Sequence, residues 1–197
     1  IDTIARCSCP SEVGEKYRYS CLNFISLQRV VEAIVGTDIN TYMRNKLYRP
    51  LGNNTMGWLP ADSLLDRIAP TECIDDVCII GDVHDPLARI MMTGVSGNAG
   101  LFSNARDVAK VYQMLIDGGM YDGKRYFSLE TCNLFMTKTS RISRRGLGFD
   151  KPDKLNPAKG PCAEEAPAEV IGHTGFTGTC AWADPKNRLV FVFLSNR

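Results

Sequence analysis

The stretch GTCAWADPKNRLVFVFLS at residues 178–195 predicts a β-hairpin, and it constrains the fold more than any other part of the chain. Its two apolar segments flank DPKN, where Pro185 presets φ for a type I turn and Asn187 tolerates the left-handed region. The second segment is apolar at every position from 189 to 194. Such a run is typical of a strand buried on both faces, so we expect a central strand with helices packed against each side.

The preceding sequence predicts mostly helices, separated by turns. Apolar residues recur at helical spacing over residues 22–35, and Gly36 is placed to end that helix. Asp38 is a candidate N-cap for a second helix, which Pro50 ends. Three more helices are expected, over 85–92, over 104–117 behind a Ser103 cap, and over about 129–136 behind a Ser128 cap, with short strands within 76–83 (DVCIIGDV) and at 147–150 (LGFD).

Composition restricts the classes of function. The chain has 197 residues, enough for one ordinary domain, and a formal net charge of +1. This balance gives no electrostatic reason to expect nucleic acid, and we interpret the basic run RISRR at 141–145 as a solvated loop. No apolar run approaches the roughly 20 residues that span a bilayer, so no membrane span is expected.

Neither a metal site nor a cofactor is expected. The eight cysteines form no repeated pair pattern, and the chain has only two histidines, His84 and His173. Asp85, which follows His84 and precedes Pro86, is interpreted as a helix start rather than as a metal ligand.

The segment GHTGFTGT at 172–179 is a candidate wall of an active site. Glycines beside a strand let backbone N–H groups approach a ligand closely. A polar side chain followed by Thr and Gly supplies the donors that an anion-stabilising edge beside a reacting carbonyl requires. The alternative is a glycine-rich turn with one surface histidine, and the segment alone leaves both open.

A second candidate is Tyr19 in YRYSC at 17–21, just before the first long helix. A tyrosine at this junction could hydrogen-bond a nucleophile, although its ordinary pKa of about 10 must fall before it acts as a base. The alternative is an aromatic side chain that faces the core.

In this order, the two segments resemble the serine β-lactamase and penicillin-binding-protein superfamily, in its class C-like branch of esterases and D-peptidases. The pattern of that family is Ser-x-x-Lys, then Tyr-x-Asn, then Lys-Thr-Gly or His-Thr-Gly on a strand. Two longer stretches also resemble it, so the resemblance covers nearly the whole chain. They are VVEAIVGTDINTYMRNKLYRPLGNNTM at 30–56 and VHDPLARIMMTGVSGNAGLFSNARDVAKVYQML at 83–115.

The resemblance implies roles for individual residues. Tyr19 would be the catalytic tyrosine that, with the lysine of the first motif, relays the proton of the nucleophile. His173 and Thr174 would face the substrate, and Gly175 would permit its close approach. The backbone N–H of Phe176 would be one of two oxyanion donors, each typically worth about 3–4 kcal/mol.

The chain departs from the family pattern at two points. Cys21 stands where the family has Asn or Asp, and a thiol donates and accepts hydrogen bonds only weakly, which puts substrate positioning in doubt. In addition, no serine has lysine three residues later. The nearest forms, SLQR at 26–29 and SNAR at 103–106, carry arginine and follow Tyr19. We therefore expect the nucleophile to precede Ile1.

The resemblance implies an α/β (α+β) lactamase/transpeptidase-like fold, truncated at both ends. One domain would have a mainly helical lobe at about 20–140, and about 1–19 and 141–197 would form part of an antiparallel sheet covered by helices. Some relatives carry an upstream glycoside hydrolase domain, and related proteins are mostly exported by bacteria, so both features are expectations for the parent protein.

The leading hypothesis for function is a parent serine hydrolase that forms an acyl-enzyme on an ester, amide or β-lactam, with the chain inactive alone. Its substrate would be a small-molecule or peptide-like acyl compound. Cys21 motivates an alternative, a degenerate lactamase-like module used for binding or scaffolding. A third hypothesis makes Cys21 the nucleophile and His173 its base.

Overall fold

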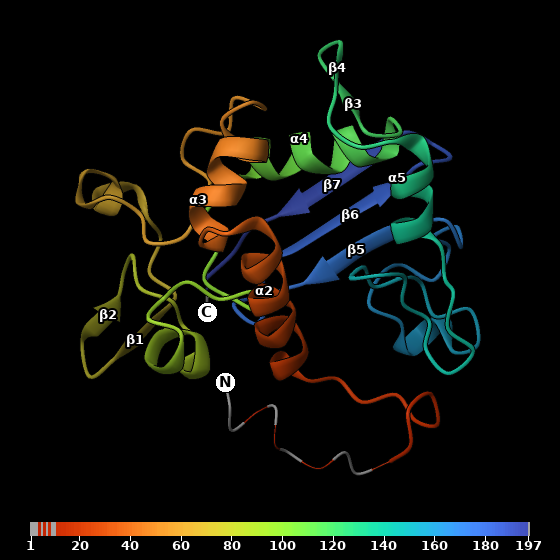
Figure 1. Ribbon diagram of the computed structural model, residues 1–197, viewed down its shortest axis with the longest axis horizontal. Coiled ribbons are helices and arrows are strands. Elements are labelled where there is room, and N and C mark those ends of the chain that lie inside the picture. Colours follow the sequence, from red (N-terminus) through yellow and green to blue (C-terminus); the bar gives the residue numbers. More distant parts are fainter. Residues whose placement is uncertain (1–3, 5, 7, 9–10, 197) are drawn as a thin grey trace. The chain divides into compact units, whose positions relative to one another are not determined.

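The computed structural model describes residues 4, 6, 8 and 11–196. Helices separated by loops and one small hairpin form the first half of the chain, and the main sheet is formed near its C-terminal end (Figure 1). Contacts group the chain into two units. Unit 1 comprises the described residues up to Ser103 together with Asn196, and unit 2 comprises Asn104–Ser195. The division near residue 140 into a helical and a sheet lobe stays a prediction.

The first long helix of unit 1, α2 (Cys21–Val35), has both ends capped. The Ser20 side chain accepts a hydrogen bond from the Leu22 N–H at 3.2 Å, and the chain leaves the helix at Gly36 with φ of 69°. Left-handed backbone at a C-terminal cap favours glycine because no Cβ is present to clash. The predicted helix and its C-terminal glycine are confirmed.

The second predicted helix of unit 1 consists of an α-helix followed by a π-helix. The Asp38 carboxylate accepts from the Thr41 N–H at 2.8 Å and begins α3 (Ile39–Met43), as predicted. The chain then continues as a π-helix, η1 (Arg44–Tyr48), and ends before Pro50. A π-helix inside a longer helix widens its turn by one residue.

A glycine-rich loop, residues 93–103, packs against α2. The Gln28 side chain accepts from the Gly97 N–H at 2.8 Å and donates to the Val95 carbonyl at 3.2 Å. The Trp58 indole N–H lies 3.0 Å from each of the Ser96 and Ala99 carbonyls. These bonds pair backbone groups that a buried loop would otherwise leave unsatisfied.

Unit 1 also contains a small hairpin, β1 (Glu72–Ile74) and β2 (Val77–Ile79). Asp75 and Asp76 both have positive φ, 49° and 62°, which forms the type I′ turn typical of two-residue hairpins. A disulfide joins the cross-strand pair Cys73 and Cys78, a pairing that the sequence had left open. The predicted strand in DVCIIGDV is confirmed as β2.

The remaining helices of unit 1 are short. The Asp85 carboxylate accepts from the Ala88 N–H at 2.8 Å, ahead of the π-helix η3 (Leu87–Met91), so Asp85 is confirmed as a helix start. A 3₁₀ helix, η2 (Asp62–Arg67), precedes β1. No helix among the described residues is long and apolar enough to cross a membrane.

The main sheet lies in unit 2 and is antiparallel. Its three strands, in the order β5-β6-β7, are β5 (Ile171–Thr174), β6 (Cys180–Asp184) and β7 (Leu189–Phe193). Helix α4 (Ala105–Ile116) packs against β6 and β7 (Figure 1). The predicted hairpin is confirmed as β6 and β7.

The predicted position of β7 in the sheet is wrong. In the described part of the chain β7 is an edge strand, and its alternate side chains Leu189, Phe191 and Phe193 are 61%, 54% and 53% exposed. The central strand is β6, where residues 181–184 are buried. An unbroken apolar run indicates that both faces are apolar, but it does not show which neighbours cover them.

The turn between β6 and β7 also differs from its prediction. The Asp184 carboxylate accepts from the N–H groups of Lys186 and Asn187, at 2.9 and 3.1 Å. This holds residues 185–187 in the turn, and the left-handed residue is Arg188, with φ of 53°, rather than Asn187.

The helix caps of unit 2 are partly as predicted. Asn104, not Ser103, caps α4, because its side chain accepts from the Asp107 N–H at 3.0 Å. Ser128 caps α5 (Leu129–Met136) as predicted. LGFD forms no strand, only a single bridge to β5. The other elements are β3 (Met120–Tyr121), β4 (Lys124–Arg125) and the 3₁₀ helix η4 (Pro157–Lys159).

Candidate active site

The segment GHTGFTGT forms most of β5 and the tight turn that leads into β6. His173 and Thr174 are the last two residues of β5 and pair with Ala181 and Cys180 of β6. His173 is half-buried, whereas Thr174 is exposed. The two predicted substrate-facing side chains therefore stand at the end of a strand whose backbone is held by its neighbour.

The turn at residues 175–179 closes on itself. The Gly175 N–H donates to the Thr179 carbonyl at 2.6 Å, and the Gly178 N–H donates to the Gly175 carbonyl at 3.1 Å. A Cβ at residue 175 would overlap the Thr179 hydroxyl, so a larger residue there would require that hydroxyl to move. Phe176 lies within this turn with its side chain exposed.

An arginine that sequence reasoning had left in solvent contacts the histidine. A guanidinium nitrogen of Arg145 lies 2.7 Å from His173 Nε2. The other ring nitrogen, Nδ1, lies 2.6 Å from the Thr174 carbonyl oxygen. Both nitrogens of the imidazole are thus engaged within unit 2.

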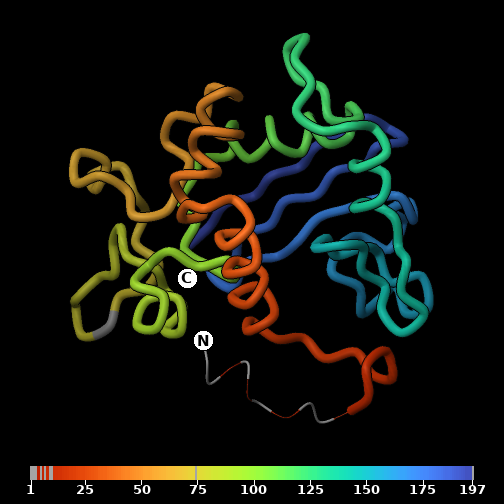
Figure 2. Tube along the Cα trace, in the orientation of Figure 1, coloured from red at the N-terminus to blue at the C-terminus, as the bar shows by residue number. Residues whose placement is uncertain are grey.

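A buried carboxylate holds Arg145 in place. Asp150 is 3% exposed and accepts from Arg145 at 2.9 Å and from two nitrogens of Arg144, at 2.7 and 2.9 Å. Its backbone pairs with Gly172 of β5 through bonds of 2.7 and 3.0 Å. Figure 2 shows the trace between α5 and β5 turning back beside β5. The interpretation of RISRR as a solvated loop is therefore wrong for Arg144 and Arg145.

Two further features fix the chain around this cluster. The Gly146 N–H donates to the Phe149 carbonyl at 3.0 Å, and this reversal returns Asp150 to the arginines. A Cβ at Gly146 would overlap the Phe135 carbonyl of α5. The buried ammonium of Lys151 donates to the Met136 carbonyl at 2.9 Å, and burial lowers the pKa of this lysine.

Tyr19 and Cys21 lie in unit 1, on either side of the N-terminal cap of α2. Tyr19 is in the loop that leads into the helix and is 60% exposed, so it is not a core-facing aromatic. Cys21 is the first residue of α2, partly exposed and not in a disulfide. The predicted loop-to-helix junction is confirmed, whereas the roles of both side chains stay predictions.

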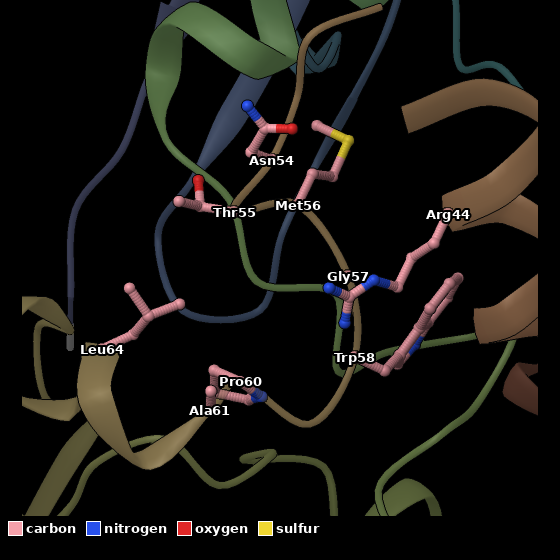
Figure 3. Close-up of a pocket in the computed structure, with 9 residues that line it drawn as sticks. All are labelled: Arg44, Asn54, Thr55, Met56, Gly57, Trp58, Pro60, Ala61 and Leu64. Carbon is pink, nitrogen blue, oxygen red and sulfur yellow. The ribbon is translucent and has the colours of Figure 1, made fainter. Parts of the chain in front are cut away.

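A small cavity in unit 1 does not include these residues. It has a volume of about 50 Å³, which is the space of one or two water molecules rather than of an acyl substrate. Figure 3 shows its lining side chains, which come from the segment after η1 and from Arg44 and Leu64. Among the described residues, no three His, Cys, Asp or Glu side chains are grouped as a metal site would require.

Comparison with known families gives a match over the entire chain. The model of the Beta-lactamase family matches residues 1–197. The chain belongs to the beta-lactamase family. The fold and the superfamily expected from the motifs are thereby confirmed, as a mixed structure of helices and an antiparallel sheet.

Curated relatives of this chain are about twice as long as it is. A protein of Escherichia coli K12, named as a proposed D-alanyl-D-alanine carboxypeptidase, is 32% identical over 214 residues, which cover 100% of this chain and 49% of that protein. The chain thus spans about half the length of the curated relatives it matches.

Solved structures of the beta-lactamase fold are similar to this chain. A β-lactamase of Mycobacterium bovis matches with a TM-score of 0.66 and 21% identity, over 95% of this chain and 59% of that one. EstCE1, described as a hydrolase with promiscuous acyltransferase activity, matches with a TM-score of 0.68 and 20% identity, over 95% and 53%. At these identities the likeness concerns the fold.

The structure brings four of the six predicted site residues together in unit 2 and places the other two in unit 1. It adds Arg144, Arg145 and Asp150, which sequence reasoning missed. The sequence pattern that could have indicated these ion pairs is an aspartate five residues after a pair of arginines. This pattern predicts the ion pairs only when the pairing of Asp150 with β5 is already known.

Proposed function

We propose that the protein containing this chain is a serine hydrolase of the beta-lactamase family that acts by acyl transfer. The observation that carries the proposal is the family match over residues 1–197, with His-Thr-Gly at the end of β5 where the motif belongs. A glycine turn beside a strand end is a setting in which backbone N–H groups can stabilise an oxyanion.

The nucleophile, in this proposal, is a serine outside these 197 residues. The chain has no Ser-x-x-Lys, and it spans about half the length of its relatives. The serine Oγ forms a bond to the acyl carbon, and the bond from that carbon to the leaving oxygen or nitrogen breaks. Tyr19 together with the lysine of that motif relays the serine proton to the leaving group. Water then cleaves the acyl–Oγ ester. The chain alone is therefore expected to be inactive.

The proposed substrate is a carboxylic ester, an amide or a β-lactam. Relatives carry the name of a D-alanyl-D-alanine carboxypeptidase, and structural neighbours include a β-lactamase and a carboxylesterase. One acyl-transfer site serves all three reactions, so the fold does not choose among them. An upstream glycoside hydrolase domain and export from a bacterial cell are further proposals, which the complete sequence of the parent would test.

Labelling of the full-length protein tests the proposal. We expect fluorophosphonate or labelled penicillin to attach to a serine of a Ser-x-x-Lys motif. If neither reagent labels a serine of the full-length protein and the protein hydrolyses no ester, the non-catalytic binding module motivated by Cys21 replaces the hydrolase.

Substitution of Tyr19 tests its role in proton transfer. Y19F should lower kcat/KM by about 10²–10⁴-fold, the usual contribution of a general acid–base group. Y17F is the matched control, because Tyr17 lies in the same loop and is 48% exposed. Equal losses for the two variants would assign the effect to the loop and not to Tyr19.

A further inference from the structure

We infer that Arg145 is a positioning residue that holds His173 as the tautomer with its proton on Nδ1. The inference starts from the 2.7 Å contact between the Arg145 guanidinium and His173 Nε2. A guanidinium has five N–H donors and no acceptor, so Nε2 must be the acceptor. An imidazole nitrogen accepts only through an unprotonated lone pair.

The second ring nitrogen gives the same assignment independently. His173 Nδ1 lies 2.6 Å from the Thr174 carbonyl oxygen, which can only accept. Nδ1 therefore donates, and the single proton of a neutral imidazole is located there. The hydrogen bond made by one nitrogen of a histidine commonly sets the tautomer in this way.

Arg145 is itself pre-positioned. Asp150 accepts from it at 2.9 Å, and the Asp150 backbone is paired with Gly172, the residue before His173. Arg144 donates to the same carboxylate and also lies 4.0 Å from Asp153. Arg145 is the arginine that lies 2.7 Å from the imidazole.

This arrangement changes what the end of β5 presents to a ligand. The lone pair of His173 Nε2 is occupied by a cationic donor, so the imidazole can act as a base only after Arg145 is displaced. The positive charge beside Thr174 is the guanidinium, and the histidine is neutral. The hypothesis of Cys21 as nucleophile with His173 as base is correspondingly disfavoured. A contribution of Arg145 to turnover rests on the proposed function.

Nitrogen NMR of the full-length protein labelled with ¹⁵N-histidine tests the tautomer directly. The spectrum of the H173Q variant assigns the His173 signals, because those signals are absent from it. We expect an Nδ1–H, Nε2-unprotonated imidazole in the unmodified protein. An Nε2–H or doubly protonated ring would overturn the inference.

Three variants then isolate Arg145. R145Q should weaken the preference for the Nδ1–H tautomer, because a glutamine amide offers Nε2 an acceptor as well as a donor and only the Thr174 carbonyl then favours Nδ1–H. R144Q, which removes the neighbouring arginine from the same carboxylate, should leave the preference unchanged. R145K should also retain it, because an ammonium group is likewise a donor without an acceptor. A tautomer left unchanged by R145Q would show that Arg145 does not set it.

Activity gives a second readout. In the full-length enzyme R145Q should lower kcat/KM roughly tenfold, the lower end of losses for an orienting partner, with partial rescue in R145K. Failure of the proposed function would appear as no turnover in any form, with the NMR result intact. An active enzyme whose R145Q variant keeps full kcat/KM would overturn the positioning role.

Discussion

Asp150 connects strand β5 to the side chains of Arg144 and Arg145. Its backbone N–H and C=O pair with Gly172, while its buried carboxylate accepts from Arg144 and Arg145. An isolated carboxylate is costly to bury, and the cost is offset only when charged donors and hydrogen bonds surround it. Removing one partner of such a group typically costs about 3–5 kcal/mol. The cluster is therefore a fixed part of the fold beside β5.

At the same scale, the buried hydroxyl of Tyr48 predicts a loss of stability at alkaline pH. Burial raises the pKa of Tyr48 from 10.0 to about 12. Between these values the unfolded chain ionises and the folded chain does not, so the free energy of unfolding falls as pH rises. The contribution is complete below pH 10 and is lost by about pH 12. At about 1.4 kcal/mol per pKa unit, it amounts to roughly 2–3 kcal/mol.

Urea denaturation at a series of pH values from neutral to strongly alkaline measures this effect. In Y48F the free energy of unfolding should no longer include the part of the alkaline decrease that is due to Tyr48. Y17F, at an exposed tyrosine, should show the same decrease as the unmodified protein. A decline of equal size in Y48F and the unmodified protein would contradict the assignment to Tyr48.

The cluster around Asp150 illustrates what sequence reasoning at the residue scale could not reach. In the sequence, Arg144 and Arg145 belong to a basic run, and such runs are usually solvated. Their partial burial depends on a carboxylate that reaches them only because Asp150 pairs with a residue 22 positions later, Gly172. Tyr19 and His173, in contrast, were found from short local motifs.

At the scale of elements, the pair of β5 and β6 depends on a glycine opposite a tryptophan. Gly172 pairs with Trp182, and a Cβ at residue 172 would overlap both the indole ring and the Ala181 carbonyl. G172A should therefore destabilise the protein by about 1–3 kcal/mol, the usual cost of overpacking. Urea denaturation of G172A, W182L and the double variant measures the coupling between the two sites.

The double variant separates crowding from other effects. If crowding causes the loss, W182L removes the obstructing ring, and the double variant should be more stable than the sum of the single changes predicts. Additive losses would mean that the glycine is needed for another reason, such as its contact with the Ala181 carbonyl alone.

Helix ends were predictable from the sequence where one local hydrogen bond decides them. Asp38 and Ser128 each accept from a backbone N–H three residues later, and Gly36 takes the left-handed conformation. Where two good caps are adjacent, as at Ser103 and Asn104, the choice depends on backbone direction and the prediction missed by one residue. The place of β7 in the sheet depends on its neighbours, which an apolar pattern does not identify.

At the scale of the whole molecule, the exposed apolar side chains of β7 predict that the 197-residue chain associates with itself. Leu189, Phe191 and Phe193 form a row on an edge strand, and exposed apolar edge strands promote association. F193K should reduce the associated fraction in sedimentation velocity with little change in thermal stability. V192K, on the opposite face beside buried Ala181, should lower thermal stability instead.

Two results would contradict this prediction. One is an unmodified chain that stays monomeric as its concentration rises. The other is a pair of variants, F193K and V192K, with the same effect on stability, which would mean that the two faces of β7 are equally covered.

The bridge between Asp150 and Gly172 has a consequence for how relatives of this chain can vary in length. Insertions within the connection between those two residues lengthen a loop and cost little, because loop-closure entropy grows slowly with length. A single-residue deletion next to Gly172 is different, since a shift of one residue turns every later side chain of a strand to its opposite face. Relatives are therefore expected to differ in the number of residues between the arginine pair and His-Thr-Gly. We expect no insertion or deletion between Gly172 and His173.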